Sequence, residues 1–445
     1  MKPAALSSVA LARRGLLALS VCCAVPWAAA QDQTHVGAGN AQALQTAQAS
    51  PLVRSAQRLL QDRAGRIQDP VLRTATLDIL RGQGTCILHR RGLATTQAQD
   101  AVIKDLMDQG LLNAKDGAAF GPGLRAGVFP PIVDADSDCP HLPQPMSSAP
   151  GSVFGGHHSY PGGLMVHEAN NELSDIGLLR QYQQVYGSHS LVQGRQVSSV
   201  LDVEAAHRQT PRSGDLPIDA DVVFAAPIWH DWAKTLVFQW NADGSEFAEF
   251  NFGGLGSQDD NGGAGDSRTA AHHILSVAES MARGLSPLMV VTQACAHSAP
   301  TLGNEYKVVN WLRAAAIIAR IDPLQAGYLS TDRAHHFRLP PLGRLGEVDL
   351  NAAGQTNVRV EYVLHNLSDA DYPYSIPAVA STEVLLRTLA PEFGYDPREV
   401  ERYNRDFRNP VFAQLGGERL LILYSVKGLE AVRLELQTLR GRKLI

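Results

Sequence analysis

Apolar residues recur with helical spacing along most of the chain. Over 52–60, 71–80 and 102–112 they return every three or four positions. One face of an α-helix repeats with this period. Residues 164–330 show the same spacing, broken by loops. We therefore expect helices in an N-terminal arm and again in the central part of the chain.

Two stretches rich in proline or glycine interrupt these helices. Residues 114–163 contain several prolines and glycines and are expected to form a loop-rich linker after the arm. Residues 241–266 contain two glycine pairs and a pair of aspartates, which favours a long surface or lid loop. Residues 31–50 are rich in Gln, Ala and Thr without an apolar period, so they are expected to be a flexible lead-in.

The pattern changes after Pro340. Apolar residues alternate with polar ones over 358–364, and 420–424 and 432–436 look similar, which predicts strands. Helical stretches lie between them. No repeat of about 20–50 residues occurs, which argues against a solenoid. The expected fold is mainly α: an arm and linker over 31–150, a helical core over 151–335, and a small α+β module over 336–445.

The first thirty residues have the features of a secretory signal peptide. Lys2, Arg13 and Arg14 precede an apolar stretch over 15–24, and small residues stand before Gln31. We expect an exported protein, periplasmic or secreted, and the arginine pair leaves twin-arginine export open beside the general route. An uncleaved N-terminal anchor is the alternative. No later stretch reaches about 18 apolar residues, so no transmembrane segment is expected in the mature chain.

Composition limits the class of partner. Of the 445 residues, 44% are hydrophobic and 19% charged, which is incompatible with a disordered chain. The net charge is −5, and it becomes −8 without residues 1–30, because that segment holds three basic residues and no acidic one. A uniformly basic nucleic-acid surface is therefore not expected, and no stable nucleic-acid partner is predicted.

Three cysteines lie beyond the expected leader. Cys86 and Cys139 stand in loop contexts rich in glycine and proline, and export implies an oxidising compartment, so they are the candidate disulfide. Cys295 lies in an apolar helical stretch and is expected to be a buried core residue.

The positions of the histidines are the main indication of a functional site. Histidines or aspartates stand within or at the end of successive apolar helical stretches: His167, His230, Asp231, His272, His273, His297 and Asp322. Burying imidazole and carboxylate groups without partners costs several kcal/mol. Such groups are therefore normally paired or bound to metal, and a mixed nitrogen and oxygen set suits a first-row divalent ion.

The order of these residues resembles the HD-domain metal-dependent phosphohydrolase superfamily. The segments HHSYPGGLMVHE, HDWAK, HHILSVAE and IIARIDPLQA are most similar to the HD-domain exoribonucleases that carry an HHxxxGGLLxH segment. The resemblance covers roughly 155–330 and implies an all-α HD-type hydrolase core. Ala233 replaces the usual glycine of the HDxGK segment, and the residue pair at His297 lacks a second histidine.

The resemblance implies a ligand set. Its metal ligands would be His167, His230, Asp231, His273, His297 and Asp322. Asp231 would bridge two ions, with His273 and His297 serving the second. His273 is preferred to His272 because His273 followed by Glu279 better matches the helix of the family.

The implied function is an exported phosphohydrolase with one or two divalent ions, Mn, Fe, Zn or Ni. Its substrate would be a small phosphomonoester or phosphodiester, such as a nucleotide. Asp231 and Lys234 would be catalytic, and His157, His158 and Lys234 would bind the substrate phosphate. Two alternatives stay open: a non-catalytic scaffold held together by a metal, and an HD-fold di-iron oxygenase. The sequence does not indicate the oligomeric state.

Overall fold

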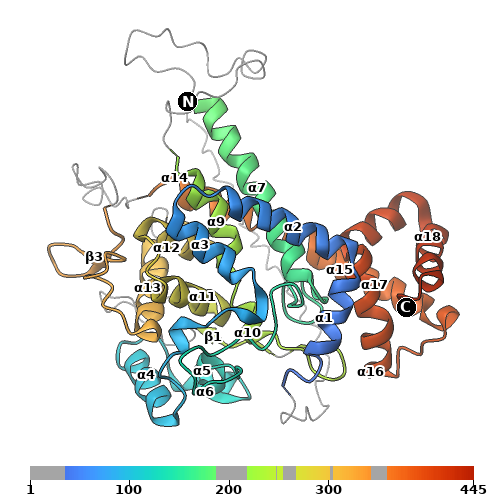
Figure 1. Ribbon diagram of the computed structural model, residues 1–445, viewed down its shortest axis with the longest axis horizontal. Helices are drawn as coiled ribbons and strands as arrows, with labels where there is room; N and C mark the ends of the chain where they lie inside the picture. Colours follow the sequence, from blue (N-terminus) through green and yellow to red (C-terminus); the bar gives the residue numbers. More distant parts are fainter. Residues whose placement is uncertain (1–35, 187–217, 247, 254–266, 301–303, 342–357) are drawn as a thin grey trace, which may run out of the picture. The chain divides into compact units, whose positions relative to one another are not determined.

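The computed structural model describes residues 36–186, 218–246, 248–253, 267–300, 304–341 and 358–445 (Figure 1). The expected signal peptide and most of the expected lid loop lie outside these residues. The α-helices in the first part are α1 (Asn40–Ala49), α2 (Pro51–Arg66), α3 (Pro70–Ile79), α4 (Thr96–Asp108), α5 (Ala114–Ala119), α6 (Gly123–Val128), α7 (Gly163–Tyr186), α9 (Ala220–His230) and α10 (Lys234–Val237).

The remaining α-helices are α11 (Ala271–Ala282), α12 (Pro287–Ala294), α13 (Glu305–Ala319), α14 (Val360–Ser368), α15 (Tyr372–Leu389), α16 (Val400–Tyr403), α17 (Asn409–Leu415) and α18 (Gly417–Gly441). Two antiparallel pairs of two-residue strands join β1 (Asn251–Phe252) to β2 (Thr269–Ala270) and β3 (Ser330–Thr331) to β4 (Phe337–Arg338). The mainly α fold class is confirmed.

The sequence marks the start of several helices. Ser50 accepts the backbone N–H of Val53 at the start of α2, and Pro51 follows it. Asp69 precedes Pro70 in the same way at α3. A polar cap satisfies an N–H group that has no partner within the helix, and proline at the first position has no N–H group that would need a partner. These signals explain why α2 and α3 begin where the sequence predicts them. The expectation of a flexible lead-in over 31–50 is wrong for Asn40–Ala49, which forms α1 with Ala43 and Ala47 buried.

The C-terminal segment corrects one expectation. Within the expected module over 336–445, residues 358–445 form helices and no strand, and Phe337–Arg338 of β4 is the extended part of its described residues. In α14 the buried residues Glu361, Leu364 and Ser368 are spaced by three and four, and in α18 Val432 and Leu436 are four apart. Short apolar runs fit either period, and here the buried positions follow the helical one.

One compact unit spans His35–Ile445. A single core cluster joins buried residues of the expected arm, such as Leu60, to residues of the central helices, such as Trp229 and Leu312. Helix α7 packs against α2, α9 and α14, and α11 packs against α9, α12 and α13. Figure 1 shows α15, α17 and α18, in orange to red, grouped together, and α17 packs against α1 and α2. Helices distant in sequence thus surround α7 and α9.

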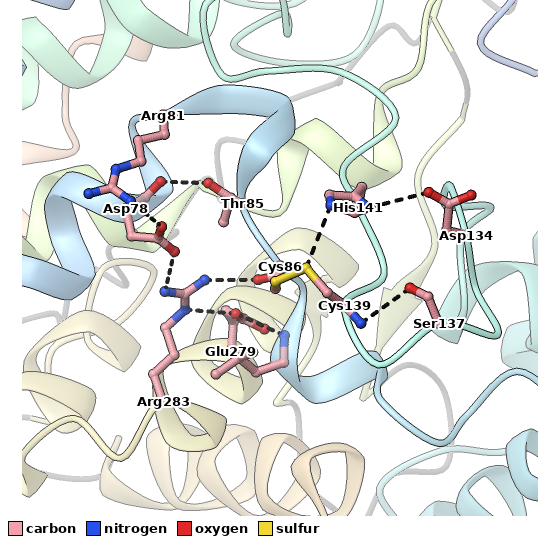
Figure 2. The surroundings of a disulfide bond; sticks show 11 residues. Asp78, Arg81, Thr85, Cys86, Asp134, Ser137, Cys139, His141, Glu279 and Arg283 are labelled. Carbon is pink, nitrogen blue, oxygen red and sulfur yellow. Dashed lines mark hydrogen bonds and ion pairs between the residues drawn. A yellow bond between two sulfur atoms is a disulfide. The ribbon is translucent and has the colours of Figure 1, made fainter.

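A disulfide joins Cys86 to Cys139, as expected. Figure 2 shows it next to Arg283, which donates to the backbone oxygen of Cys86, to Asp78 and to Glu279. The bond therefore ties the loop-rich linker to the arm at a point where α11 also contacts the arm. Cys295 is a buried free thiol, as expected.

No helix within the described residues combines the length and apolar character needed to cross a membrane.

Replacing Cys86 and Cys139 together by serine is expected to lower the free energy of unfolding. The disulfide closes a loop of 53 residues, and such a restriction of the unfolded chain stabilises by roughly 2–4 kcal/mol. Urea unfolding of the oxidised protein and of the double variant measures the difference. Equal midpoints and equal slopes would contradict this expectation.

Candidate metal centre

Side chains from separate helices converge on the carboxylate of Asp231. His167 comes from α7, and His230 is the last residue of α9, with Asp231 directly after it. His272 lies in the first turn of α11, and Asp369 directly follows α14. All but Asp369 are almost completely buried. Helix ends therefore bring imidazole and carboxylate groups to one point inside the protein.

The first half of the cluster surrounds Oδ2 of Asp231. Nε2 of His167 lies 3.2 Å from this oxygen, and Nε2 of His230 lies 3.4 Å from it. Oδ1 of Asp369 lies 3.2 Å from Nε2 of His167 and 3.6 Å from Nε2 of His230. Two imidazole nitrogens and two carboxylate oxygens thus face a common point.

The second half involves Oδ1 of Asp231. Nε2 of His272 lies 3.0 Å from this oxygen. Ligand atoms of Asp231, His272 and His297 all lie within 4.8 Å of one another. The two oxygens of one carboxylate therefore face two different sets of imidazoles.

A second partner orients each imidazole. Nδ1 of His167 lies 3.2 Å from Oδ1 of Asp371, and Nδ1 of His230 lies 3.0 Å from the backbone oxygen of Pro227. Nδ1 of His272 lies 2.6 Å from Oε1 of Glu249. His297 likewise contacts Thr269 through Nδ1, at 2.9 Å. Partners of this kind hold a metal-ligating histidine by one nitrogen and direct the other towards the ion.

These residues fit a divalent metal ion. Among the buried polar atoms without a hydrogen-bond partner are Nε2 of His230, Nε2 of His272 and Oδ1 of Asp231. Leaving such groups unpaired in the interior is costly. Nitrogen and oxygen ligands together are a set that metal ions bind in proteins. The buried clusters could therefore hold a metal ion.

The carboxylates strongly influence the protonation of the imidazoles. Burial opposes a positive charge on His230, but Asp231, Glu168 and Asp369 outweigh it and raise its pKa to about 10. Burial likewise opposes ionisation of Asp231, and the positive charges of His230 and Lys234 outweigh it, so its pKa is well below the usual range. Since only neutral imidazole binds metal, loading the site would release protons.

The residues expected to bind substrate lie beside this cluster. Ligand atoms of His157, His158, His167 and Asp371 lie within 4.8 Å of one another. Lys234 is buried and donates from Nζ to Oδ2 of Asp231 and to the backbone oxygen of Gly151. The structure thus brings His157, His158 and Lys234 together with His167, His230 and Asp231.

Asp322 is separated from the other residues of the expected ligand set. It is exposed beyond the end of α13, and its carboxylate accepts the backbone N–H groups of Leu324 and Gln325. It belongs to a turn instead of a metal cluster. Asp369 occupies the position expected for Asp322, since its carboxylate contacts His167 and His230.

His272 replaces His273 in the second set. Nε2 of His273 lies 3.1 Å from the backbone oxygen of Ala294 on α12, and its ring stacks on that of His297. Neighbouring residues on a helix point about 100° apart, so only one of the two can face Asp231. Glu279, which supported the other choice, contacts His89 and Arg283 instead.

Sequence reasoning missed Asp369 and Asp371. Both follow α14 in a segment that was expected to be near a strand of the C-terminal module, well outside the stretch of resemblance. A signal existed: His365, Asp369 and Asp371 end an apolar helical run, as His230 and Asp231 do. Read with the helical period, this segment would have been a second candidate for the final aspartate.

Gly162 and Gly163 serve backbone packing. A Cβ atom on Gly163 would lie 1.8 Å from the backbone oxygen of His158, and one on Gly162 would lie 2.5 Å from the side chain of Val53. Gly162 also has a φ of 82°, which glycine adopts readily. The pair therefore lets the loop of His157 and His158 fold back against the start of α7.

A row of buried acids continues from the cluster along α7. Glu168, Glu172 and Asp175 lie on one face of the helix at i, i+4 and i+7, and none is accessible to solvent. Nδ1 of His365 lies 3.5 Å from Asp175, and Nε of Arg63 lies 3.7 Å from Glu172. Burial raises the pKa of Glu168 to about 8 and, with the charge of Asp175, that of Glu172 to about 9.

Asp369→Asn is expected to weaken metal binding at least tenfold, because it removes a carboxylate charge that faces His167 and His230. Loss of even an outer partner of a metal ligand lowers metal affinity about 10–100-fold. Asp322→Asn is the matched control and should leave the affinity unchanged. Titration of the metal-free protein with Mn²⁺, followed by calorimetry, compares the two. Weaker binding in the Asp322 variant alone would contradict the assignment.

Glu172→Gln is expected to stabilise the protein increasingly as the pH rises from about 5 to about 9. The pKa of Glu172 is raised from 4.5 to about 9, so the folded state keeps a proton that the unfolded state loses, and the stability of the natural chain falls over this range. Glutamine does not titrate, so the variant lacks this contribution to the pH dependence of stability. Melting temperatures at pH 5 and pH 8.5, with the exposed Glu430→Gln as control, measure it. A constant difference between the two pH values would count against the raised pKa.

Comparison of the chain with protein-family models, with curated proteins and with solved structures found no match in any of the three. The geometry around Asp231 is therefore the basis for any functional conclusion.

Proposed function

We propose that the protein is a metal-dependent phosphohydrolase that cleaves a phosphomonoester or phosphodiester with water. The observation that carries the proposal is the shared carboxylate of Asp231. Its Oδ2 faces His167 and His230 while its Oδ1 faces His272. One carboxylate between two sets of imidazoles suits a pair of divalent ions, an arrangement used for phosphoester hydrolysis.

Some of the residues would bind the ions, and others would stabilise the charge on the substrate. His167, His230, Asp231 and Asp369 would hold the first ion, and Asp231, His272 and His297 the second. Bound divalent ions lower the pKa of water towards about 7, which provides hydroxide at neutral pH.

Lys234 favours hydrolysis over the alternative of a purely structural metal site. It is buried, and burial opposes its charge, but Asp231 outweighs burial and raises its pKa, so it carries a positive charge beside the cluster. A fixed cation there would stabilise the negative charge that develops on a phosphoryl group. His157 and His158, from the loop before α7, would add donors on the same side.

The resemblance to HD-domain phosphohydrolases agrees with this proposal once Asp369 takes the final place in the ligand series. Export to the periplasm or to the medium stays part of the proposal, and the Cys86–Cys139 disulfide suits an oxidising compartment.

The proposal is tested with purified protein, Mn²⁺ and two generic esters, p-nitrophenyl phosphate and bis(p-nitrophenyl) phosphate. We expect release of nitrophenol that a chelator removes and Mn²⁺ restores. Asp231→Asn should reduce kcat/KM by more than about a hundredfold, the upper end of the effect of losing an outer partner. Asp322→Asn is the control and should retain activity.

Metal that raises the melting temperature without hydrolysis of any ester would overturn the proposal in favour of a structural metal site. Oxygen uptake by iron-loaded protein, without ester hydrolysis, would favour an oxygenase.

A further inference from the structure

A cavity of about 870 Å³ adjoins the metal cluster. Residues of α2, α7, α15, α17 and α18 line it, and its lining includes His158 and Asp371. Ligand atoms of these two residues lie within 4.8 Å of those of His157 and His167. One end of the cavity is therefore formed by two side chains that neighbour His167 of the cluster, and a volume of this size accommodates a complete small-molecule ligand.

The walls away from the cluster are mainly apolar. Its apolar lining there consists of Leu52, Val166, Tyr374, Leu415, Ile422 and Leu439. The lining also includes the charged residues Arg419, Glu435 and Arg442, of which Arg419 pairs with Glu435 at 3.6 Å. Tyr374 and Ile422 are 46% and 52% exposed, although both are large apolar residues. Apolar surface that is left open beside a polar site is typical of a ligand-binding pocket.

Several polar side chains in the lining already have partners within the protein. Asn170 donates to Oδ2 of Asp371 at 2.9 Å, and the hydroxyl of Thr438 donates to the backbone oxygen of Leu434 at 2.9 Å. Ser375 donates to Glu418, and its hydroxyl lies 3.3 Å from Nδ1 of His158. A nucleobase or sugar is recognised through hydrogen bonds to its edges, whereas these side chains make theirs internally.

We propose, on the basis of the hydrolase function above, that the cavity binds the organic group of the substrate and that this group is a long apolar chain. The substrate class is then a phosphate ester of a long-chain alcohol. Its phosphate lies at the ions, beside Lys234 and His158, and its chain extends between α15 and α18 past Tyr374 and Ile422.

The first test compares ethyl phosphate with dodecyl phosphate, kept below its micelle concentration, using Mn²⁺-loaded protein and release of inorganic phosphate. Dodecyl phosphate should have a kcat/KM at least about tenfold higher, equivalent to the burial of about two methylene groups. Equal values for the two esters would overturn the inference and leave the hydrolase proposal intact.

Two variants of α18 test whether this cavity is the site that favours dodecyl phosphate over ethyl phosphate. Ile422 and Leu434 are similarly exposed, at 52% and 56%, and only Ile422 belongs to the cavity lining. Ile422→Glu should reduce the preference for dodecyl over ethyl phosphate about tenfold, because a charge then meets the chain. Leu434→Glu should leave the preference unchanged. Equal reductions in both variants would overturn the assignment of the cavity.

A binding measurement separates this inference from the hydrolase proposal. Dodecylphosphonate and ethylphosphonate are not hydrolysed at the phosphorus–carbon bond, and calorimetry gives their affinities for the metal-loaded protein. Tighter binding of dodecylphosphonate that Ile422→Glu weakens supports the cavity assignment even if no ester is cleaved. Equal affinities of the two phosphonates overturn it.

Discussion

The structure of the site depends on one buried carboxylate. Asp231 contacts His167 and His230 through one oxygen and His272 through the other, while Lys234 also donates to it. An ionised carboxylate inside a protein is strongly destabilising without such partners. The contacts of this carboxylate therefore favour one arrangement of α7, α9, α10 and α11, and displacement of any of them would remove a partner of a buried charge.

The same requirement explains the outer layer of contacts. Each imidazole that faces Asp231 has a polar oxygen near its other nitrogen, from Asp371 at 3.2 Å, from Pro227 or from Glu249. These contacts fix which nitrogen points inward before any ion binds, so little reorganisation is needed on binding. Asp371 belongs to both sites, because it lies beside His167 and also lines the cavity. Ion binding and substrate binding would thus share a residue.

The prediction of the site was most accurate where local sequence fixes geometry. His230 and Asp231 end an apolar helix, and adjacent residues at a helix end can reach one point, so their pairing was visible in the sequence. The choice between His272 and His273 depended on the rotation of α11 against α12, which a single apolar stretch does not reveal. The assignment of Asp322 rested on the resemblance of its segment to the HD-domain family, whereas the final carboxylate comes from Asp369, farther along the chain.

The sequence by itself determined the helical fold, the Cys86–Cys139 pair and most of the groups that meet at Asp231. Helical period, capping residues and the cost of burying polar groups act over a few residues, so they can be recognised locally. Only the tertiary structure decided that 358–364, 420–424 and 432–436 are helical, that Asp369 and Asp371 complete the cluster, and that a cavity adjoins it. These features depend on which faces of distant helices pack together, and that packing follows from the burial of many side chains at once.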